Sequence, residues 1–203
     1  MKSFQMTTST RQQFVLQAKK LFAQRGFYGT SIATIANALG LTKQALLHYF
    51  GSKEKLYGEV LLQISSGLLT ESERTLKADH QATERLSDLV IAHYHLLMND
   101  DDSARLIMRE LLDNEQRAEK AGSWYLASYL NALVDTAMEI ETIKHLGRAQ
   151  ALAFIYQLLG AAHYFAVSQP TLEQIFGRAL SKQTRAGYER ELRNLISGRL
   201  RPM

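Results

Sequence analysis

Apolar residues recur every three or four positions along most of this chain, which is the spacing of helices that bury one face. Stretches of this kind cover residues 10–25, 31–39, 43–50, 52–76, 86–97, 104–111, about 115–142, 147–168 and the tail around 188–196. Only two prolines occur in 203 residues, and no run alternates as a half-buried strand does. The pattern therefore predicts an all-α fold.

The first two predicted helices begin with short polar caps. A capping box from Thr10 to Gln13 opens the first, and residues before Thr10 are expected to form a loose arm. Thr30 or Ser31 can cap the second, and Gly40 ends it in a left-handed conformation. The inward positions of these two helices are Phe14, Ala18, Leu21, Phe22, Ile32, Ile35, Ala36 and Leu39.

A third short helix follows after only a tight turn. Thr42 is its predicted cap, and Leu46 and Phe50 are spaced to anchor it on the core. Gly51 can end it, and Ser52 can cap the long helix that begins there. Two short helices around a glycine turn are the layout of a helix-turn-helix, whose second helix enters the major groove of DNA.

Charge separates this region from the rest of the chain. Residues 1–57 hold eight lysines and arginines against the single acid Glu54, a net charge of +7. The remaining residues hold sixteen basic and nineteen acidic side chains, a net charge of −3. A basic end on a mildly acidic body is expected where one domain alone meets phosphate, so the charge favours DNA as the partner.

Several separated motifs resemble the N-terminal signature of the TetR family of bacterial repressors. They are Thr30-Ser31, Ile35-Ala36 with Gly40-Leu41-Thr42-Lys43, His48-Tyr49-Phe50, Ser52-Lys53-Glu54-Lys55-Leu56, and Gly26-Phe27-Tyr28 after the first helix. The resemblance, over about residues 10–57, implies a three-helix DNA-binding domain at 1–57. It implies a larger helical domain at 58–203 that dimerises and binds an effector. The expected function is a homodimeric regulator, as a repressor, that reads a palindromic DNA operator and is released by a small molecule.

The residues of the helix-turn-helix divide into two expected roles at DNA. Hydroxyl and ammonium groups should hold phosphates, and these belong to Thr30, Ser31, Thr42, Tyr49 and Lys53. Base edges should be read from the outer side of the second short helix, by Lys43, Gln44, Ala45, Leu47 and His48. The family often has Tyr where Leu47 stands, and an apolar side chain there offers only contact with a thymine methyl group.

The body carries side chains that suit an apolar pocket with few hydrogen-bonding groups. We expect a small, largely apolar effector to be bound by His93, Tyr94, Met98, Met108, Trp124, Tyr125, Tyr129 and Tyr156. Core packing is the alternative for each of them, so a pocket rests mainly on the resemblance. The same holds for the residues expected at the dimer interface, which are Gly160, Ala161, Tyr164, Tyr188, Leu192, Leu195 and Ile196.

Other chemistry has little support. Asp100-Asp101-Asp102 lacks the alternating ligands of a calcium loop, and His93 and His95 face different sides of a helix. Catalytic, phosphate-loop and dinucleotide motifs do not occur, so we expect no metal, no cofactor and no catalytic residue. A helical enzyme with a basic N-terminal region and a non-specific DNA-binding scaffold remain open. With no cysteine, signal peptide or membrane span, the expected location is the bacterial cytoplasm, at the nucleoid, without a membrane partner.

Overall fold

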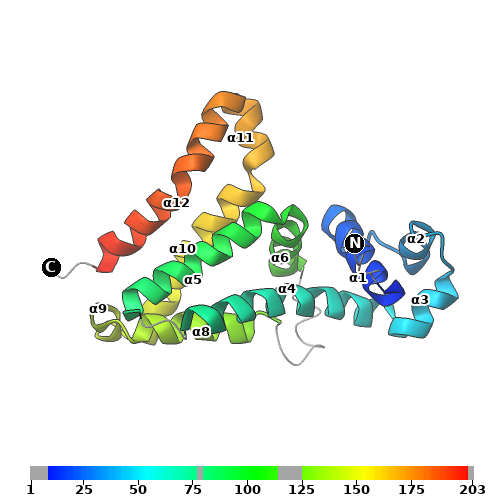
Figure 1. Cartoon of the computed structure of the whole chain (residues 1–203), viewed down its shortest axis with the longest axis horizontal. Coiled ribbons are helices and arrows are strands. Elements are labelled where there is room, and N and C mark those ends of the chain that lie inside the picture. The colour runs from blue at the N-terminus through cyan, green and yellow to red at the C-terminus, as the bar shows by residue number, and fades with distance from the viewer. Residues whose placement is uncertain (1–8, 77–79, 114–124, 201–203) are drawn as a thin grey trace, which may run out of the picture.

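The computed structural model describes residues 9–76, 80–113 and 125–200 (Figure 1). Their helices are α1 (Thr10–Arg25), α2 (Ile32–Asn37), α3 (Lys43–Phe50), α4 (Lys53–Leu76), α5 (Ala82–Asn99), α6 (Asp101–Asp113), α8 (Ala127–Met138), α9 (Glu141–Lys144), α10 (Arg148–Val167), α11 (Gln169–Phe176) and α12 (Arg178–Leu200). No strand occurs in these described ranges. The predicted all-α class is confirmed.

The helices form a small head and a larger body (Figure 1). α1, α2 and α3 gather at one end, and the long helix α4 runs from them along the body. α5, α6, α8 and α10 pack together, with α5 and α8 against α4, while α11 and α12 form a hairpin that projects beyond them. The predicted boundary between residues 57 and 58 falls inside α4, so one continuous helix joins head and body.

The head has its own aromatic core. Phe14 and Phe22 on α1 are fully buried, and Leu46 and Phe50 on α3 are buried against them. The Phe14 and Phe50 rings meet edge to face at 6.2 Å, and Phe22 meets Tyr57 of α4 in the same way at 4.9 Å. Edge-to-face pairs favour one relative placement of the rings, so this core fixes how α3 is presented.

Side-chain caps begin each helix of the head. Thr42 accepts a hydrogen bond from the backbone amide of Ala45 at 3.1 Å, which confirms the predicted start of α3. Gly40 and Gly51 have φ of +67° and +75°, as their predicted positions at helix ends require. The expectation for α1 was wrong by one residue: Ser9, and not Thr10, is its cap.

The body differs from the sequence expectation in two places. The helix predicted for about 115–142 ends at Met138, and the separate short helix α9 follows; residues 114–124 lie outside the described ranges. The second difference is α11, which was not predicted. Pro170 ends α10 as expected, but it then stands in the first turn of α11, where its missing amide hydrogen costs nothing.

A membrane-spanning helix was sought in the same ranges. No single helix is both long enough and apolar enough to cross a bilayer. The pair α10 and α11 passes a test of length and composition when taken together, but it bends by 62° at the break between them.

Candidate DNA interface and ligand pocket

The outer face of α3 is the candidate DNA-reading surface. Gln44 and His48 lie about 160° around the helix from the buried Leu46, because successive residues turn by about 100°. Both are exposed, as is Lys43, whereas Leu47 is half-buried. Gln44 and His48 therefore occupy the centre of the exposed face, with Lys43 at its N-terminal edge. Ala45, also expected to read bases, is half-buried and packs on the core.

Two of the hydroxyl groups expected at phosphates lie at helix N-termini on the surface. Ser31 accepts a hydrogen bond from the Thr34 amide at 3.0 Å, and Thr42 does the same for Ala45. Each oxygen acts as a cap, and the exposed Thr42 hydroxyl keeps its own hydrogen to donate. Tyr49 is 44% exposed, and its ring leans on Phe14 at 5.9 Å.

Two of the side chains expected at phosphates form hydrogen bonds within the head. Thr30 is buried, and its hydroxyl lies 2.9 Å from the carbonyl oxygen of Gly26 and 3.2 Å from that of Leu21. Lys53 Nζ donates to the carbonyl oxygens of Phe27 at 3.0 Å and Thr30 at 3.2 Å, and it sits 4.1 Å from the centre of the Phe27 ring. Both side chains hold the turn between α1 and α2.

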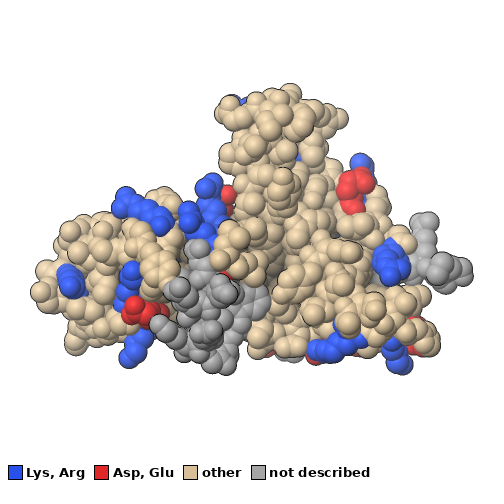
Figure 2. Space-filling view, turned by 180° about the vertical axis from the view of Figure 1, so that it is seen from behind, with Lys and Arg blue, Asp and Glu red and all other residues tan. Residues whose placement is uncertain are grey.

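The positive charge of the head is partly used inside the molecule. Arg11 pairs with Glu59 at 2.9 Å, and Lys19 pairs with Asp100, which lies between α5 and α6. Four further cations have neither an ion pair nor a side-chain hydrogen bond among the described residues, and they are Lys20, Arg25, Lys43 and Lys55. Figure 2 shows basic side chains spread over one face of the head, with a single small acidic group among them.

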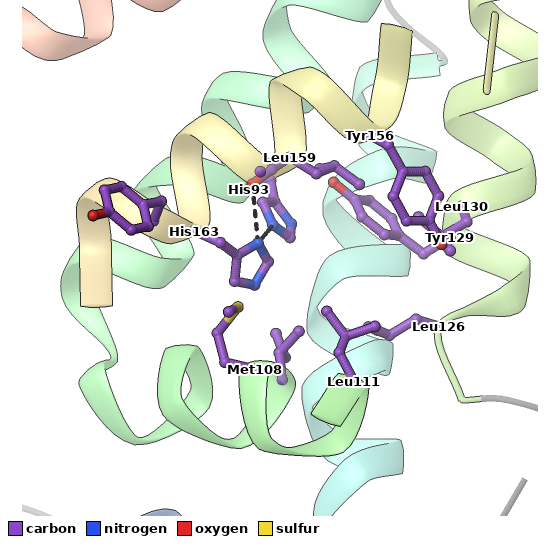
Figure 3. Close-up of a pocket in the computed structure, with 12 residues that line it drawn as sticks. His93, Met108, Leu111, Leu126, Tyr129, Leu130, Tyr156, Leu159 and His163 are labelled. Carbon is purple, nitrogen blue, oxygen red and sulfur yellow. Dashed lines mark hydrogen bonds between the residues drawn. The ribbon is translucent and has the colours of Figure 1, made fainter. Parts of the chain in front are cut away.

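The body encloses a cavity of about 320 Å³ (Figure 3). Its walls come from α5, α6, α8 and α10 together with Leu126 just before α8. The lining residues are His93, Ile107, Met108, Leu111, Leu126, Tyr129, Leu130, Tyr156, Leu159, Gly160, His163 and Tyr164. No lysine, arginine or acid is among them. The volume is at the lower end of the range usual for small-molecule sites.

Four of the residues expected to bind an effector line this cavity: His93, Met108, Tyr129 and Tyr156. Trp124 lies outside the described residues, and the other three do not line it. Tyr94 packs on Tyr188, with ring centres 5.6 Å apart, and Met98 packs against the core. Tyr125 lies against α4, where a Cβ atom on Gly58 would come within 2.7 Å of its hydroxyl.

The sequence reasoning missed most of the cavity wall. His163 was not considered, although it lies near Tyr156 and Gly160 on an apolar helix, where a histidine is unusual. The missed leucines, such as Leu130 and Leu159, cannot be told from ordinary core residues by their spacing. Gly160 and Tyr164, which were expected at the dimer interface, line the cavity as well.

His93 and His163 face each other at one side of the cavity (Figure 3). His93 Nε2 and His163 Nδ1 are 3.2 Å apart, so one nitrogen must carry the hydrogen and the other must accept it. Burial, and then repulsion between the two rings, hold the pKa of His93 well below its usual 6.5. Burial also lowers the pKa of His163, and the hydrogen bond from its Nδ1 to the carbonyl oxygen of Leu159 raises this pKa by a smaller amount. The pair is neutral at pH 7.

The residues expected at the dimer interface fall into two groups. Leu192 and Ile196 are buried within the chain, and Tyr188 donates from its hydroxyl to the carbonyl oxygen of Ala161 at 2.9 Å. These contacts correct the expectation that Leu192 and Ile196 face a second copy. The exposed members are Gly160, Tyr164 and Leu195. On α10 they continue a stripe of exposed residues at spacings of four, which are Leu152, Tyr156, Gly160 and Tyr164.

Helix α6 contacts both the cavity and the head. Met108 lines the cavity, while the next residue, Arg109, donates to the carbonyl oxygens of Ala23 at 3.0 Å and Gln24 at 3.2 Å. These carbonyls belong to the last turn of α1, which has no helical donors of its own for them. The Tyr57 hydroxyl on α4 donates to the buried Glu110 carboxylate at 2.6 Å, so α6 is also tied to α4.

Comparison with known proteins identifies the head. The model of the tetR family of bacterial regulatory proteins matches residues 15–60. One similar protein is the transcriptional activator FasR of Mycolicibacterium smegmatis, which is 29% identical over 48% of this chain and 44% of FasR. Another is the transcriptional repressor KstR2 of the same organism, which is 28% identical over 48% of this chain and 52% of KstR2. This chain thus spans about half the length of these two relatives. The regulator RutR of Escherichia coli is 26% identical over 86% of this chain and 85% of RutR.

Solved structures agree over nearly the whole chain. A TetR-family regulator from Bordetella parapertussis has a TM-score of 0.72 at 18% identity, covering 94% of this chain and 95% of that one. FadR from Bacillus subtilis in complex with stearoyl-CoA has a TM-score of 0.69 at 20% identity, covering 92% and 97%. These likenesses support the fold, and the three relatives are transcriptional regulators by name. Residues 15–60 of the chain match the tetR family of bacterial regulatory proteins, and the chain as a whole has the fold of TetR-family regulators.

Proposed function

We propose that this protein is a homodimeric repressor that binds a palindromic DNA operator through α3 and leaves it when a small molecule fills the cavity of the body. The observation that carries the proposal is the outward face of α3. Its exposed polar side chains stand opposite two buried anchors, on a head whose free charges are positive. An enzyme or a general DNA scaffold has no need of such a face.

Base reading belongs to the centre of that face. Gln44 can present its amide to adenine N6 and N7, and Lys43 can donate to guanine O6 and N7. His48 is placed beside Gln44 for either a base or a phosphate. We keep Ser31, Thr42 and Tyr49 as phosphate contacts, and we leave out Thr30 and Lys53 because their polar groups are bonded within the head.

Dimerisation is supported by exposed apolar residues on the last helices. The α10 stripe carries Tyr156, 49% exposed, and Tyr164, 75% exposed, and α12 adds Leu195 at 50%. Large side chains at regular helical spacing are costly to leave in water, and a second copy related by a two-fold axis would cover the same stripe on both chains. Two heads held in this way would read two half-sites of a palindrome.

Helix α6 is the proposed link between effector and DNA. A ligand that pushes on Met108 or Ile107 acts on the same helix whose Arg109 holds the end of α1. Because α3 is anchored on α1 through aromatic contacts, a shift of α6 would change the position of the reading helix. The effector must bind the two arrangements with different affinity for this to happen.

Selection of bound fragments from a random DNA pool tests the function. We expect a single enriched palindrome whose binding weakens with rising salt. Gln44→Ala should relax the preference at one base-pair position in each half-site, whereas Gln174→Ala, an exposed glutamine on α11, should leave the selected sequence unchanged. A pool without an enriched palindrome, or equal weakening on operator and random DNA by Gln44→Ala, would overturn this reading.

A further inference from the structure

At the cavity, three buried polar side-chain atoms have no hydrogen-bond partner among the residues that the structure describes. They are His93 Nδ1, Tyr129 Oη and His163 Nε2. All three side chains line the cavity, and they are only 1, 2 and 6% exposed respectively. An unpaired buried polar atom destabilises a fold, so three together indicate a site that is completed by another molecule.

The three side chains come from three different helices and lie together. The rings of His93 on α5 and Tyr129 on α8 are stacked at 5.5 Å, almost parallel at 13°. The rings of His93 and His163, from α10, have centres 4.8 Å apart. In Figure 3 the His163 ring hangs into the open space above Met108, with one nitrogen directed to His93 and the other away from it. The free nitrogen of His163 is therefore the one that faces the cavity.

The histidine pair offers the cavity a hydrogen-bond acceptor. His163 Nδ1 lies 3.2 Å from both His93 Nε2 and the carbonyl oxygen of Leu159. The carbonyl oxygen can only accept, so Nδ1 carries the hydrogen of the neutral His163 ring and Nε2 is free to accept one from a ligand hydroxyl. The Tyr129 hydroxyl, whose pKa is raised by burial, remains a neutral donor.

The rest of the lining excludes a buried charge. Ile107, Met108, Leu111, Leu126, Leu130 and Leu159 supply apolar surface, and no charged side chain is among the described residues that line the cavity. An ionised carboxylate, phosphate or ammonium group would lose its water there without gaining an opposite charge from these residues, which is very costly. A hydroxyl group loses far less water, and it can both donate to His163 Nε2 and accept from the Tyr129 hydroxyl.

We propose that the cavity binds a neutral, largely apolar molecule whose single hydroxyl group donates a hydrogen bond to His163 Nε2 and accepts one from the Tyr129 hydroxyl. An alcohol fits this chemistry, and the free acid or amine of the same carbon skeleton does not. The proposal names the chemical class of effector for the function proposed above and rests on that function for its regulatory meaning. Ligand binding itself does not depend on DNA.

A matched series of probes tests the proposal on the full-length protein. Decanone, decanol, decanoate, decylamine and decane share one chain length and differ in the polar group. Calorimetric titration should give tightest binding for decanol, with decanoate and decylamine at least tenfold weaker. His163→Phe keeps an aromatic ring but removes the acceptor, so it should reduce the preference for decanol over decane by about tenfold. Tyr129→Phe should reduce the same preference by a smaller factor.

His95→Phe is the matched control, because His95 lies on α5 beyond the cavity lining and pairs with Glu189. It should leave every affinity unchanged, and circular dichroism should show all three variants folded. Tighter binding of decanoate or decanone than of decanol, an unchanged preference in His163→Phe, or no binding of decanol would overturn the proposal. Failure to enrich a palindrome from the DNA pool would instead overturn the proposed function, and the titrations would still decide the ligand class.

Discussion

Lys53 gives the clearest test of how the head is built. Its ammonium group donates to two carbonyl oxygens of the α1–α2 turn and lies over the Phe27 ring. Hydrogen bonds from a charged donor contribute about 1.5–3 kcal/mol each when buried, and a cation–π contact about 0.5–1 kcal/mol at an exposed site. Lys53 is half-buried, so we expect the contribution of each hydrogen bond to lie at or below the low end of that range.

One term opposes this stabilisation. Lys53 is the first residue of α4, and a positive charge there meets the positive end of the helix dipole at a cost of about 0.3–1 kcal/mol. We therefore expect Lys53→Ala to lower the free energy of unfolding by about 2 kcal/mol. Lys55→Ala, two residues further along and exposed, should change it by no more than about 0.5 kcal/mol.

Urea unfolding followed by circular dichroism measures both variants, and a salt titration of operator binding measures the DNA contribution. If Lys53 acts within the head, Lys53→Ala loses stability and keeps the salt dependence of the wild type. A phosphate contact would give the opposite pattern, with unchanged stability and a salt slope smaller by about one. That second pattern would refute the assignment of Lys53 to the turn.

Two further predictions concern the body. Tyr57→Phe removes the donor that reaches the buried Glu110 carboxylate, so urea unfolding should show a free energy of unfolding lower by about 1.5–3 kcal/mol. The control Tyr49→Phe, at the exposed face of the head, should lower it by less than about 0.5 kcal/mol. Equal losses in the two variants would refute the role of this hydrogen bond. The neutral histidine pair predicts a fold that loses stability in acid. Because the pKa values of both histidines are lowered in the folded chain, the unfolded chain binds protons below about pH 6.5 that the folded chain does not. The free energy of unfolding should therefore fall by up to about 1.4 kcal/mol per pH unit for each histidine. Melting temperatures from pH 8 to pH 5 should fall less steeply for His163→Phe than for the wild type, and an unchanged slope would contradict the neutral pair.

The head could be predicted from sequence almost completely because its signals are local. Thr42 caps a helix only three residues away, and Gly40 and Gly51 end helices at positions that the apolar spacing already marks. The errors in the head came from longer contacts. Nothing in the spacing tells that Lys53 reaches back to Phe27, 26 residues earlier, or that the Thr30 hydroxyl turns inward.

The cavity could be predicted only in part, because its walls come from four helices far apart in the chain. His93 and His163 are separated by 70 residues, and each alone looks like a single polar residue on an apolar helix. Packing also decides which aromatic side chains face the space: Tyr129 lines the cavity, whereas Tyr94 turns to Tyr188 and Phe165. Such choices depend on how helices cross, which the sequence pattern of one helix does not contain.

The contacts of α6 set a scale for the coupling between the cavity and DNA. In the proposed mechanism, an effector that lowers operator affinity a hundredfold supplies about 2.7 kcal/mol by preferring one arrangement of the helices. The two hydrogen bonds of Arg109 to the end of α1, partly exposed, contribute about 1–3 kcal/mol in total. Breaking or straining this one attachment is therefore of the right size to release DNA. A large rearrangement of the body is not required, because Arg109 follows Met108 of the cavity wall directly in the chain.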